Sequence, residues 1–251
     1  MNQVIQQLKA RKSVRIFTDE PIKPEEVSAI LESAVNAPTA GNQQLYTIIH
    51  VTDPQLKAQL AESCDDQSFI ATAPLVLVFC ADCRKWYHAF LEYGCDPRKP
   101  GVGDLLLAVS DTNIAAQNAV VAAQSLGIGS CYIGDIMENA ELQRKLLSLP
   151  EYVFPAAMLV FGYPTASQLE RPKPPRSEMG YIVHENSYRD MDAEELKQML
   201  SVKTGARGFE EWIQAFCNRK YNSDFSREMT RSVQVFLEDF QERASDIKEK
   251  K

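Results

Sequence analysis

A cluster of cations lies near the start of the chain, in the run Arg11-Lys12-Ser13-Val14-Arg15. Three positive charges and a hydroxyl within five residues suit a phosphate monoester. Guanidinium groups form short charge-assisted hydrogen bonds and can bind two phosphate oxygens at once. The alternative is an ordinary solvated surface at the end of a helix, where cations also favour the negative end of the dipole. The whole chain carries a net charge of -7, so the cluster stands out against an acidic background.

A second candidate for chemistry is the pair Cys80-x-x-Cys83, which has the spacing of half a zinc site or of a redox dithiol. Cys80 ends an apolar run, which favours a place in the core. No second pair of this spacing follows, so a zinc site would lack ligands. The six cysteines are scattered, and we expect them to be reduced structural thiols. Zinc or dithiol chemistry stays open as an alternative. The chain has three histidines: His50, His88 and His184.

Length and composition place the chain among soluble globular proteins. It has 251 residues, of which 45% are hydrophobic and 24% charged, as expected for one large domain or a core domain with an appendage. The acidic net charge argues against a nucleic-acid partner. Apolar stretches such as 73–81 and 153–161 are too short to cross a membrane. The N-terminus lacks the apolar core of a secretory signal, so we expect a cytoplasmic protein without a membrane partner.

The elements that must position these residues follow from apolar periodicity and from start signals such as Pro24 with Glu25 and Glu26. The pattern over 104–126 is apolar nearly all round, which is typical of a helix in a core or at a subunit interface. Segment 164–180 holds four prolines and is expected to be extended, and the last 60 residues to be helical. Strands and helices interleave, which predicts an α/β or α+β protein. Further helices are expected over about 2–10, 24–35, 54–63, 84–93, 140–147 and 224–242, and strands over 46–51, 75–79, 130–133 and 155–163.

Five segments, in this order, resemble the nitroreductase family of FMN-dependent NAD(P)H oxidoreductases. They are ARKSVRIFTDEPI, NAPTAGNQQ, DTNIAAQNAVVAAQSLGIGSCYIGDI, LVFGYP with the following RPKPPR, and HENSY. The match spans about residues 1–190. The run HENSYRDMD and the helical tail are similar to the larger, NADPH-preferring branch of nitro and flavin reductases.

The resemblance implies an α+β sandwich with a mainly antiparallel, four- or five-stranded sheet flanked by helices. It implies a domain-swapped homodimer, in which the long helix packs against its twin and FMN lies at the interface, touched by both subunits. Residues 1–190 would form the FMN-binding domain. Residues 191–251 would form a helical extension that packs on the core or on the partner subunit.

The resemblance also implies which residues bind FMN. The phosphate would be held by the basic cluster and by a second basic arm, where this chain has Lys-Pro-Pro-Arg instead of the family's Lys-Pro-Arg. A polar loop from the partner would touch the ribityl chain or the ring, a glutamine would bind the ring edge, and backbone N–H groups would face flavin N5 and O4. Relatives often have a second glycine where this chain has Asp135. The implied residues are Arg11, Lys12, Ser13, Arg15, Lys173 and Arg176 for the phosphate, and Thr39, Asn42, Gln43, Gln67, Tyr132, Ile133 and Gly134 for the rest.

The implied reaction is a ping-pong cycle. NADPH or NADH would pass hydride to flavin N5, and a nitroaromatic, a quinone or a free flavin would then accept two electrons. No side chain is expected to act as an acid or base. Arg207 is a candidate for the 2′-phosphate of NADPH, against the alternative of an ordinary loop cation. The other functional alternative is an FMN-binding protein of the same fold, with a specialised reductive role or without an enzymatic one.

Overall fold

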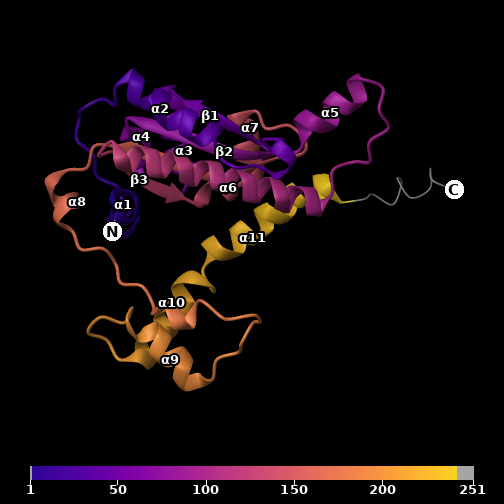
Figure 1. Ribbon diagram of the computed structural model, residues 1–251. Helices are drawn as coiled ribbons and strands as arrows, with labels where there is room; N and C mark the ends of the chain where they lie inside the picture. The colour runs from indigo at the N-terminus through magenta and orange to yellow at the C-terminus, as the bar shows by residue number, and fades with distance from the viewer. Residues whose placement is uncertain (1, 242–251) are drawn as a thin grey trace. The chain divides into compact units, whose positions relative to one another are not determined.

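The computed structural model describes residues 2–241, and the chain divides into two compact units (Figure 1). The first comprises Met1–Arg171 and Glu228–Lys251, and the second comprises Pro172–Arg227. The boundaries between the two units therefore lie after Arg171 and before Glu228. The expected extension over 191–251 lies partly in each unit, its residues beyond 241 lie outside the described part, and its role stays a prediction.

The first unit is built on a four-stranded sheet with the order β1-β2-β4-β3 and antiparallel neighbours. Every residue of β2 and β4 is buried, which explains why these strands are continuous apolar runs without polar alternation. The α+β class and the antiparallel sheet are therefore confirmed. The strands are β1 (Tyr46–Val51), β2 (Leu75–Asp82), β3 (Gly129–Ile133) and β4 (Val153–Gly162).

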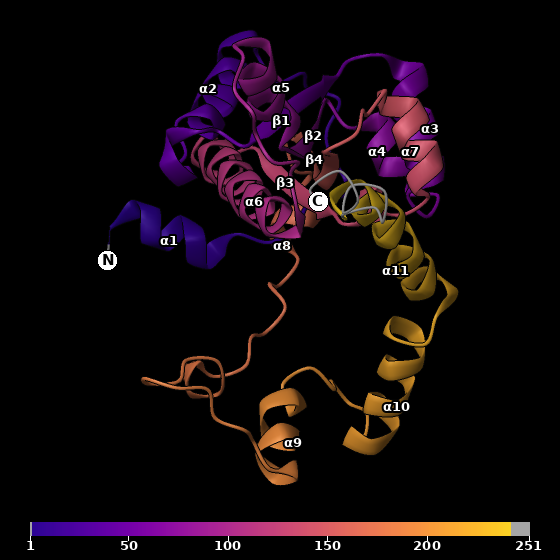
Figure 2. The same cartoon turned by 90° about the vertical axis from the view of Figure 1, so that its right-hand side faces the viewer.

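Helices cover both faces of this sheet (Figure 2). On one face, α2 (Pro24–Val35) and α6 (Val102–Ser125) form a core with Leu77 and Phe79 of β2. On the other face lie α3 (Pro54–Ser63), α4 (Ser68–Thr72), α7 (Ala140–Leu147) and the end of α11 (Asp224–Leu237). Phe236 of α11 is 1% exposed and packs edge-on against Phe154 of β4, with ring centroids 5.2 Å apart. The C-terminal helix thus completes the core of the first unit.

Helix α6 is the longest element of the described chain. It begins at Val102, two residues before the expected start, because Asp104 accepts the Gly101 N–H at 2.8 Å and closes the first turn. It is long and apolar enough to cross a membrane by length and composition, and 44% of its most apolar window is buried inside the protein. The core helix of a globular protein has the same character.

The segment that contains the basic cluster lies against strands β3 and β4. Helix α1 (Gln3–Ala10) leads into this segment, whose Val14 N–H donates to the Ser130 carbonyl at 3.0 Å. A Cβ on Gly129 would lie 2.7 Å from Val14, and a Cβ on Gly162 would lie 2.6 Å from Phe17. Only glycine at these positions lets the segment lie so close to β3 and β4.

The remaining elements are short. The helix expected over 224–242 ends its α-helical part at Leu237 and continues as a 3-10 turn, and Glu242 lies outside the described residues. The extended segment 164–180 contains an unexpected short helix, α8. The bounds are α5 (Arg84–Glu92), α8 (Ala166–Glu170), α9 (Ala193–Ser201), α10 (Phe209–Lys220), and 3-10 helices at Ala40–Asn42, Asp135–Met137, Met179–Tyr181 and Glu238–Phe240.

The second unit lacks a core of its own. None of the residues 172–227, all of which the structure describes, has a buried side chain. On α10, the rings of Trp212 and Phe216 stack with centroids 5.1 Å apart. A unit of this size that buries so little surface cannot offset the entropy of folding alone.

Candidate functional site

Arg11 has buried donors that lack partners. Its guanidinium carbon lies 6.0 Å from the centre of the Tyr132 ring. Its Nε and Nη2 atoms are buried and form no hydrogen bond with any described residue. Because an unpaired buried donor is costly, such a group fits a site that an anionic ligand completes.

Arg171 is in the same situation, and sequence patterns did not mark it as a site residue. Its Nη2 donates to the Ser13 carbonyl, while its Nε is buried without a partner among the described residues. The available signal was its position in the segment RPKPPR, next to the expected second basic arm. Arg11 and Arg171 therefore both bring unpaired guanidinium N–H groups to the basic segment, Arg11 as part of it and Arg171 through its contact with Ser13.

Ser13 and Arg15 converge with Arg11 around the thiol of Cys131. Burial raises the pKa of this thiol, and the Arg15 charge, a hydrogen bond with Ser13 and the Arg11 charge oppose that rise. The backbone N–H of Arg15 is fixed by Gln168 Oε1 at 3.2 Å, and its side chain is exposed. The structure thus brings three of the four expected phosphate residues of the first cluster to one place.

Lys12 has a different position from its neighbours. Its Nζ donates to the carbonyl of Leu169 at 2.7 Å and to that of Arg171. The ammonium group therefore links the basic segment to residues 169–171, and this contact helps to hold Arg171 in place. A direct role of Lys12 toward a phosphate stays a prediction.

Tyr132 and Ile133 end strand β3 beside this cluster, and Gly134 follows directly after the strand. Ile133 is 2% exposed and belongs to the core. Burial raises the pKa of Tyr132 to about 12, against the effect of the Arg11 charge, so its hydroxyl stays neutral. Gly134 has ordinary α-region angles, and a Cβ there would meet Met137 at 3.8 Å, which is normal contact. Nothing within the described chain requires a glycine at this position.

The segment after Gly134 carries a buried carboxyl group. Glu138 is 6% exposed, and its Oε1 has no hydrogen-bond partner among the described residues. Burial raises its pKa to about 7, and the charges of Asp135, Asp65 and Glu228 add to the effect.

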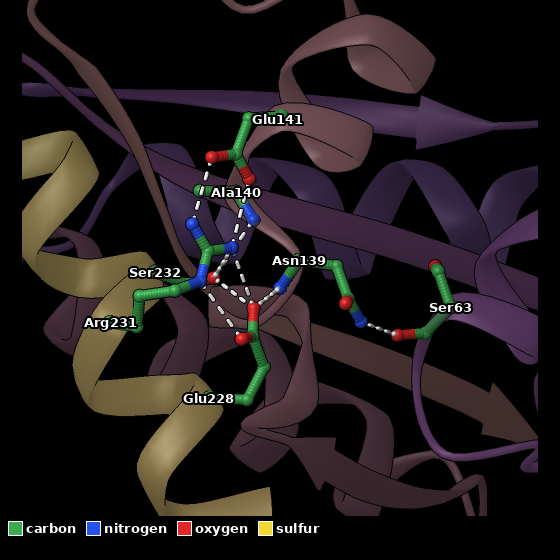
Figure 3. Close-up of polar contacts among 7 residues, drawn as sticks. All are labelled: Ser63, Asn139, Ala140, Glu141, Glu228, Arg231 and Ser232. Carbon is green, nitrogen blue, oxygen red and sulfur yellow. Dashed lines mark hydrogen bonds and ion pairs between the residues drawn. The ribbon is translucent and has the colours of Figure 1, made fainter.

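A network of polar contacts joins the start of α7 to α11 and holds the segment that follows Gly134 (Figure 3). Asn139, in left-handed conformation at φ 52°, donates through Nδ2 to the Ser63 carbonyl at 3.0 Å and through its backbone N–H to Glu228 at 3.2 Å. The Ala140 N–H donates to Ser232 Oγ at 2.9 Å. Glu228 and Ser232 therefore satisfy two of the free N–H groups at the start of α7.

Gln67 lies at the start of α4, a few residues after Ser63, which the network of Asn139 contacts. Its side chain donates to the Cys64 carbonyl at 2.8 Å, and its backbone N–H donates to the Ala61 carbonyl at 3.0 Å. Because Asn139 binds Ser63, the segment that holds Gln67 and the segment after Gly134 are joined by hydrogen bonds. The structure places both at the same face of the sheet.

The loop with Thr39, Asn42 and Gln43 lies elsewhere. Thr39 Oγ1 donates to the buried carboxylate of Asp111 on α6, and Trp86 Nε1 donates to the Gln43 carbonyl at 2.7 Å. This loop precedes β1, at the opposite edge of the sheet from β3. Three strand spacings separate these edges, roughly 14 Å. Within one chain, the loop and the basic cluster are not brought together.

Lys173, Arg176 and Arg207 belong to the second unit. Arg176 is exposed, and its Nη1 donates to the Pro174 carbonyl at 3.4 Å. The Arg207 N–H donates to the Thr204 carbonyl at 3.3 Å in the turn after α9. Their roles in binding phosphate groups stay predictions.

Cys80 and Cys83 show no features of a metal or redox site. Burial raises the pKa of each thiol to about 12, so both are protonated and weakly reactive. All six cysteines are free, and the described residues contain no cluster that could hold a metal ion. The geometry therefore gives the zinc or dithiol alternative no support.

An antiparallel sheet with helices on both faces and unpaired guanidinium donors at one edge defines an α+β protein with a candidate anion site. The sequence pattern of the Nitroreductase family matches residues 8–163, which is more than half of the chain. The chain belongs to the nitroreductase family, as the five segments predicted.

Named relatives extend this result. The chain is 31% identical over 241 residues to an FMN reductase [NAD(P)H] of Bacillus subtilis, covering 95% of this chain and 92% of the relative. It is 35% identical over 192 residues to an oxygen-insensitive NADPH nitroreductase of Salmonella typhimurium, covering 76% and 77%. Its fold matches the NADPH:FMN oxidoreductase from Vibrio harveyi complexed with NAD+, with a TM-score of 0.78, 26% identity and coverage of 94% and 98%.

Proposed function

We propose that this protein is an NAD(P)H-dependent FMN oxidoreductase that reduces nitroaromatics, quinones or free flavins. The observation that carries the proposal is the set of three buried guanidinium donors without partners among the described residues, two on Arg11 and one on Arg171. Arg11 lies beside the half-buried ring of Tyr132. Relatives named as FMN reductase and NADPH nitroreductase support the cofactor and the hydride donor. Bound FMN supplies the hydride-transfer chemistry, and the protein supplies binding, orientation and electrostatics.

The basic segment would hold the phosphate. Arg11, Arg15 and Arg171 contribute guanidinium groups, which bind phosphate oxygens in pairs, and Ser13 contributes a hydroxyl. Lys12 would keep Arg171 in position through its contact with the Arg171 carbonyl. Lys173 and Arg176 would form the second basic arm, and Arg207 would bind the 2′-phosphate of NADPH.

The end of β3 would lie along the flavin ring. Gly134 is exposed and needs no glycine for its own backbone angles, so a ligand that approaches the backbone closely gives a reason for the missing side chain. Backbone N–H groups of Ile133 and Gly134 can orient the ring, and the Gln67 amide can bind its edge. The hydroxyl of Tyr132 stays neutral because of its raised pKa, so it adds no negative charge to the site.

The working form would be a homodimer. Helix α1 has no buried residue, and α6 leaves Leu106, Leu107 and Ile114 between 41% and 63% exposed. The second unit likewise has no buried side chain, so these surfaces need a second copy to cover them. The partner subunit would also supply the loop with Thr39, Asn42 and Gln43, which lies too far from the basic cluster of its own chain.

The state of the thiols supports a proposal for the cell compartment. Six free cysteines, four of them buried, suit a reducing compartment, so we place the protein in the cytoplasm, acting on small molecules without a membrane or a nucleic acid.

Titration with FMN tests the binding site directly. Arg11→Ala and Arg171→Ala should each weaken FMN binding by about 1.5–3 kcal/mol, the value of a hydrogen bond to a charged group. Arg84→Ala, on α5, is a matched control that should leave the affinity unchanged. FMN affinity unchanged in both test variants would contradict the phosphate assignment. Tight FMN binding without reduction by NADPH or NADH would favour the non-enzymatic flavin-binding alternative.

A further inference from the structure

Asp111, in the interior of α6, carries a carboxylate without a cation beside it. Its side chain belongs to a residue that is 3% exposed, and none of the ion pairs among the described residues includes it. A buried carboxylate is unfavourable unless hydrogen-bond donors satisfy its oxygens. The role of Asp111 therefore follows from the groups that donate to it.

The donors that the described chain offers to Asp111 come from one loop. Thr39 Oγ1 donates to Asp111 Oδ2, and the Ala40 N–H donates to Oδ1 and Oδ2 at 3.1 and 3.2 Å. Hydrogen bonds to an ionised acceptor are roughly twice as strong as neutral ones. The partners are 72 and 71 positions apart in the chain, so one carboxylate fastens the start of the loop to the long helix.

The rest of this loop has an unfavourable backbone conformation. Gly41, Asn42 and Gln44 are left-handed, with φ of 56°, 56° and 51°. Residues other than glycine keep this conformation only where the surrounding contacts hold them in it. The Gln44 N–H donates to Thr39 Oγ1 at 2.8 Å. The Thr39 hydroxyl therefore links Asp111 to the far end of the loop.

The Thr39 hydroxyl has no proton left for a ligand. Its single proton is donated to Asp111, and its oxygen accepts the Gln44 N–H. Thr39 therefore serves to hold the loop in shape and cannot donate a hydrogen bond to a flavin. Asn42, on the same loop, is exposed, so a ligand can reach it.

We propose that Asp111 is a positioning residue, which fixes residues 39–44 in the conformation that contacts the flavin of the partner subunit. This inference rests on the proposed function, which places FMN at a dimer interface and assigns the loop to it. Helix α6 also carries the exposed Leu106 and Ile114, which a second copy would cover. Asp111 thus fixes the loop to the helix that would form the dimer contact, and a loop shaped in advance lowers the entropic cost of binding.

Hydrogen exchange, followed by mass spectrometry on the full-length protein with and without FMN, reports on the loop without turnover. Asp111→Asn leaves one acceptor oxygen for two donors. The amides of Ala40 and Gln44 should therefore exchange about tenfold faster or more than in wild type. FMN titration should show an affinity about tenfold weaker, as expected when only about a tenth of the molecules hold the binding conformation.

Asn118→Ala is the matched control on α6. The Asn118 side chain donates to the Ser33 carbonyl at 3.2 Å, so it joins α6 to α2 without contacting the loop. This variant should lower the free energy of unfolding and leave both the exchange of residues 40–44 and the FMN affinity unchanged.

A second pair of variants keeps the test decisive if Asp111→Asn does not fold. Thr39→Val removes only the hydroxyl and should give the same fast exchange, whereas Thr39→Ser keeps the hydroxyl and should retain slow exchange. Wild-type exchange in both Asp111→Asn and Thr39→Val would overturn the anchoring role. Fast exchange with unchanged FMN affinity would overturn the link to the flavin. A wild-type protein that binds no FMN would instead overturn the proposed function.

Discussion

The guanidinium group of Arg231, on α11, forms two hydrogen bonds with the carboxylate of Glu141, on α7, at 2.8 and 2.9 Å (Figure 3). The same group binds Glu228, one turn earlier on α11, at 2.7 Å. Because Glu228 also accepts the Asn139 N–H, the returning C-terminal helix holds the segment that follows Gly134. Helix α11 thus supports the candidate flavin site without lining it.

Ser232→Ala should lower the free energy of unfolding by about 1–2 kcal/mol, the cost of losing a helix N-cap. Ser232 is fully buried, accepts the Ala140 N–H at 2.9 Å and donates to Glu228 at 2.8 Å. Chemical denaturation measures the change. Ser28→Ala, at an exposed position of α2, should have an effect near zero. Equal effects of the two substitutions would show that the cap does not stabilise α7.

Arg231→Gln should remove part of the acid sensitivity of the protein. The Arg231 contact lowers the pKa of Glu141 and of Glu228 to about 2, from 4.5 for an ordinary glutamate. A lowered folded-state pKa gives stability that is present above pH 4.5 and is lost as the pH falls toward 2. The difference in melting temperature between wild type and variant should therefore be largest near pH 6 and shrink below pH 3.

A control on the same helix is Arg227→Gln, whose ion pair with Asp224 is exposed and 3.7 Å long. This variant should follow the wild-type curve, because an exposed pair contributes little. A difference between wild type and Arg231→Gln that does not change from pH 6 to pH 3 would rule out the ionic contribution.

Glu138→Gln should stabilise the protein at alkaline pH. Glu138 is buried, and its folded-state pKa is raised to about 7. Folding therefore favours the protonated form of Glu138. The stability that this protonated form contributes is present below pH 4.5 and is lost as the pH rises through 7. Melting curves should place the variant above wild type at pH 8 by about 2 °C or more, with little difference at pH 4.5. Glu62→Gln, exposed on α3, should show no such dependence.

The elements with strong local signals could be predicted from the sequence. Helices Pro24–Val35 and Pro54–Ser63 have the expected bounds, because proline in the first turn fixes their starts. Strand β2 extends three residues beyond the expected Phe79, since its end depends on pairing with β1 and β4. Helix α4 was missed because five residues carry too little periodicity to be distinguished from a loop.

The candidate site could be predicted only in part, for a similar reason. The basic cluster is contiguous in sequence, so its residues were found from their types and spacing. Arg171 contacts the carbonyl of Ser13, which lies far away in the chain, so its place became visible only in three dimensions. The contact of Lys12 with backbone carbonyls also depends on the fold, because any exposed lysine has the same sequence signal.

Ile114→Glu should convert a dimer into a monomer. Ile114 is 41% exposed on α6, and a carboxylate buried in an apolar interface without a partner is strongly unfavourable. Light scattering should give twice 28.2 kDa for the wild-type protein and 28.2 kDa for the variant. His50→Glu, at an exposed position of β1, is the control and should remain a dimer. A monomeric wild type would contradict the proposed assembly.

The central claim is that NAD(P)H reduces FMN bound at the basic edge of the sheet. The most direct test is the visible absorption spectrum of the FMN-loaded protein before and after addition of NADPH, and separately of NADH, without oxygen. The flavin bands should bleach within the mixing time with at least one of the two donors and return when 1,4-naphthoquinone is added. A protein that takes up no FMN, or whose flavin bands persist with both donors, would contradict the central claim.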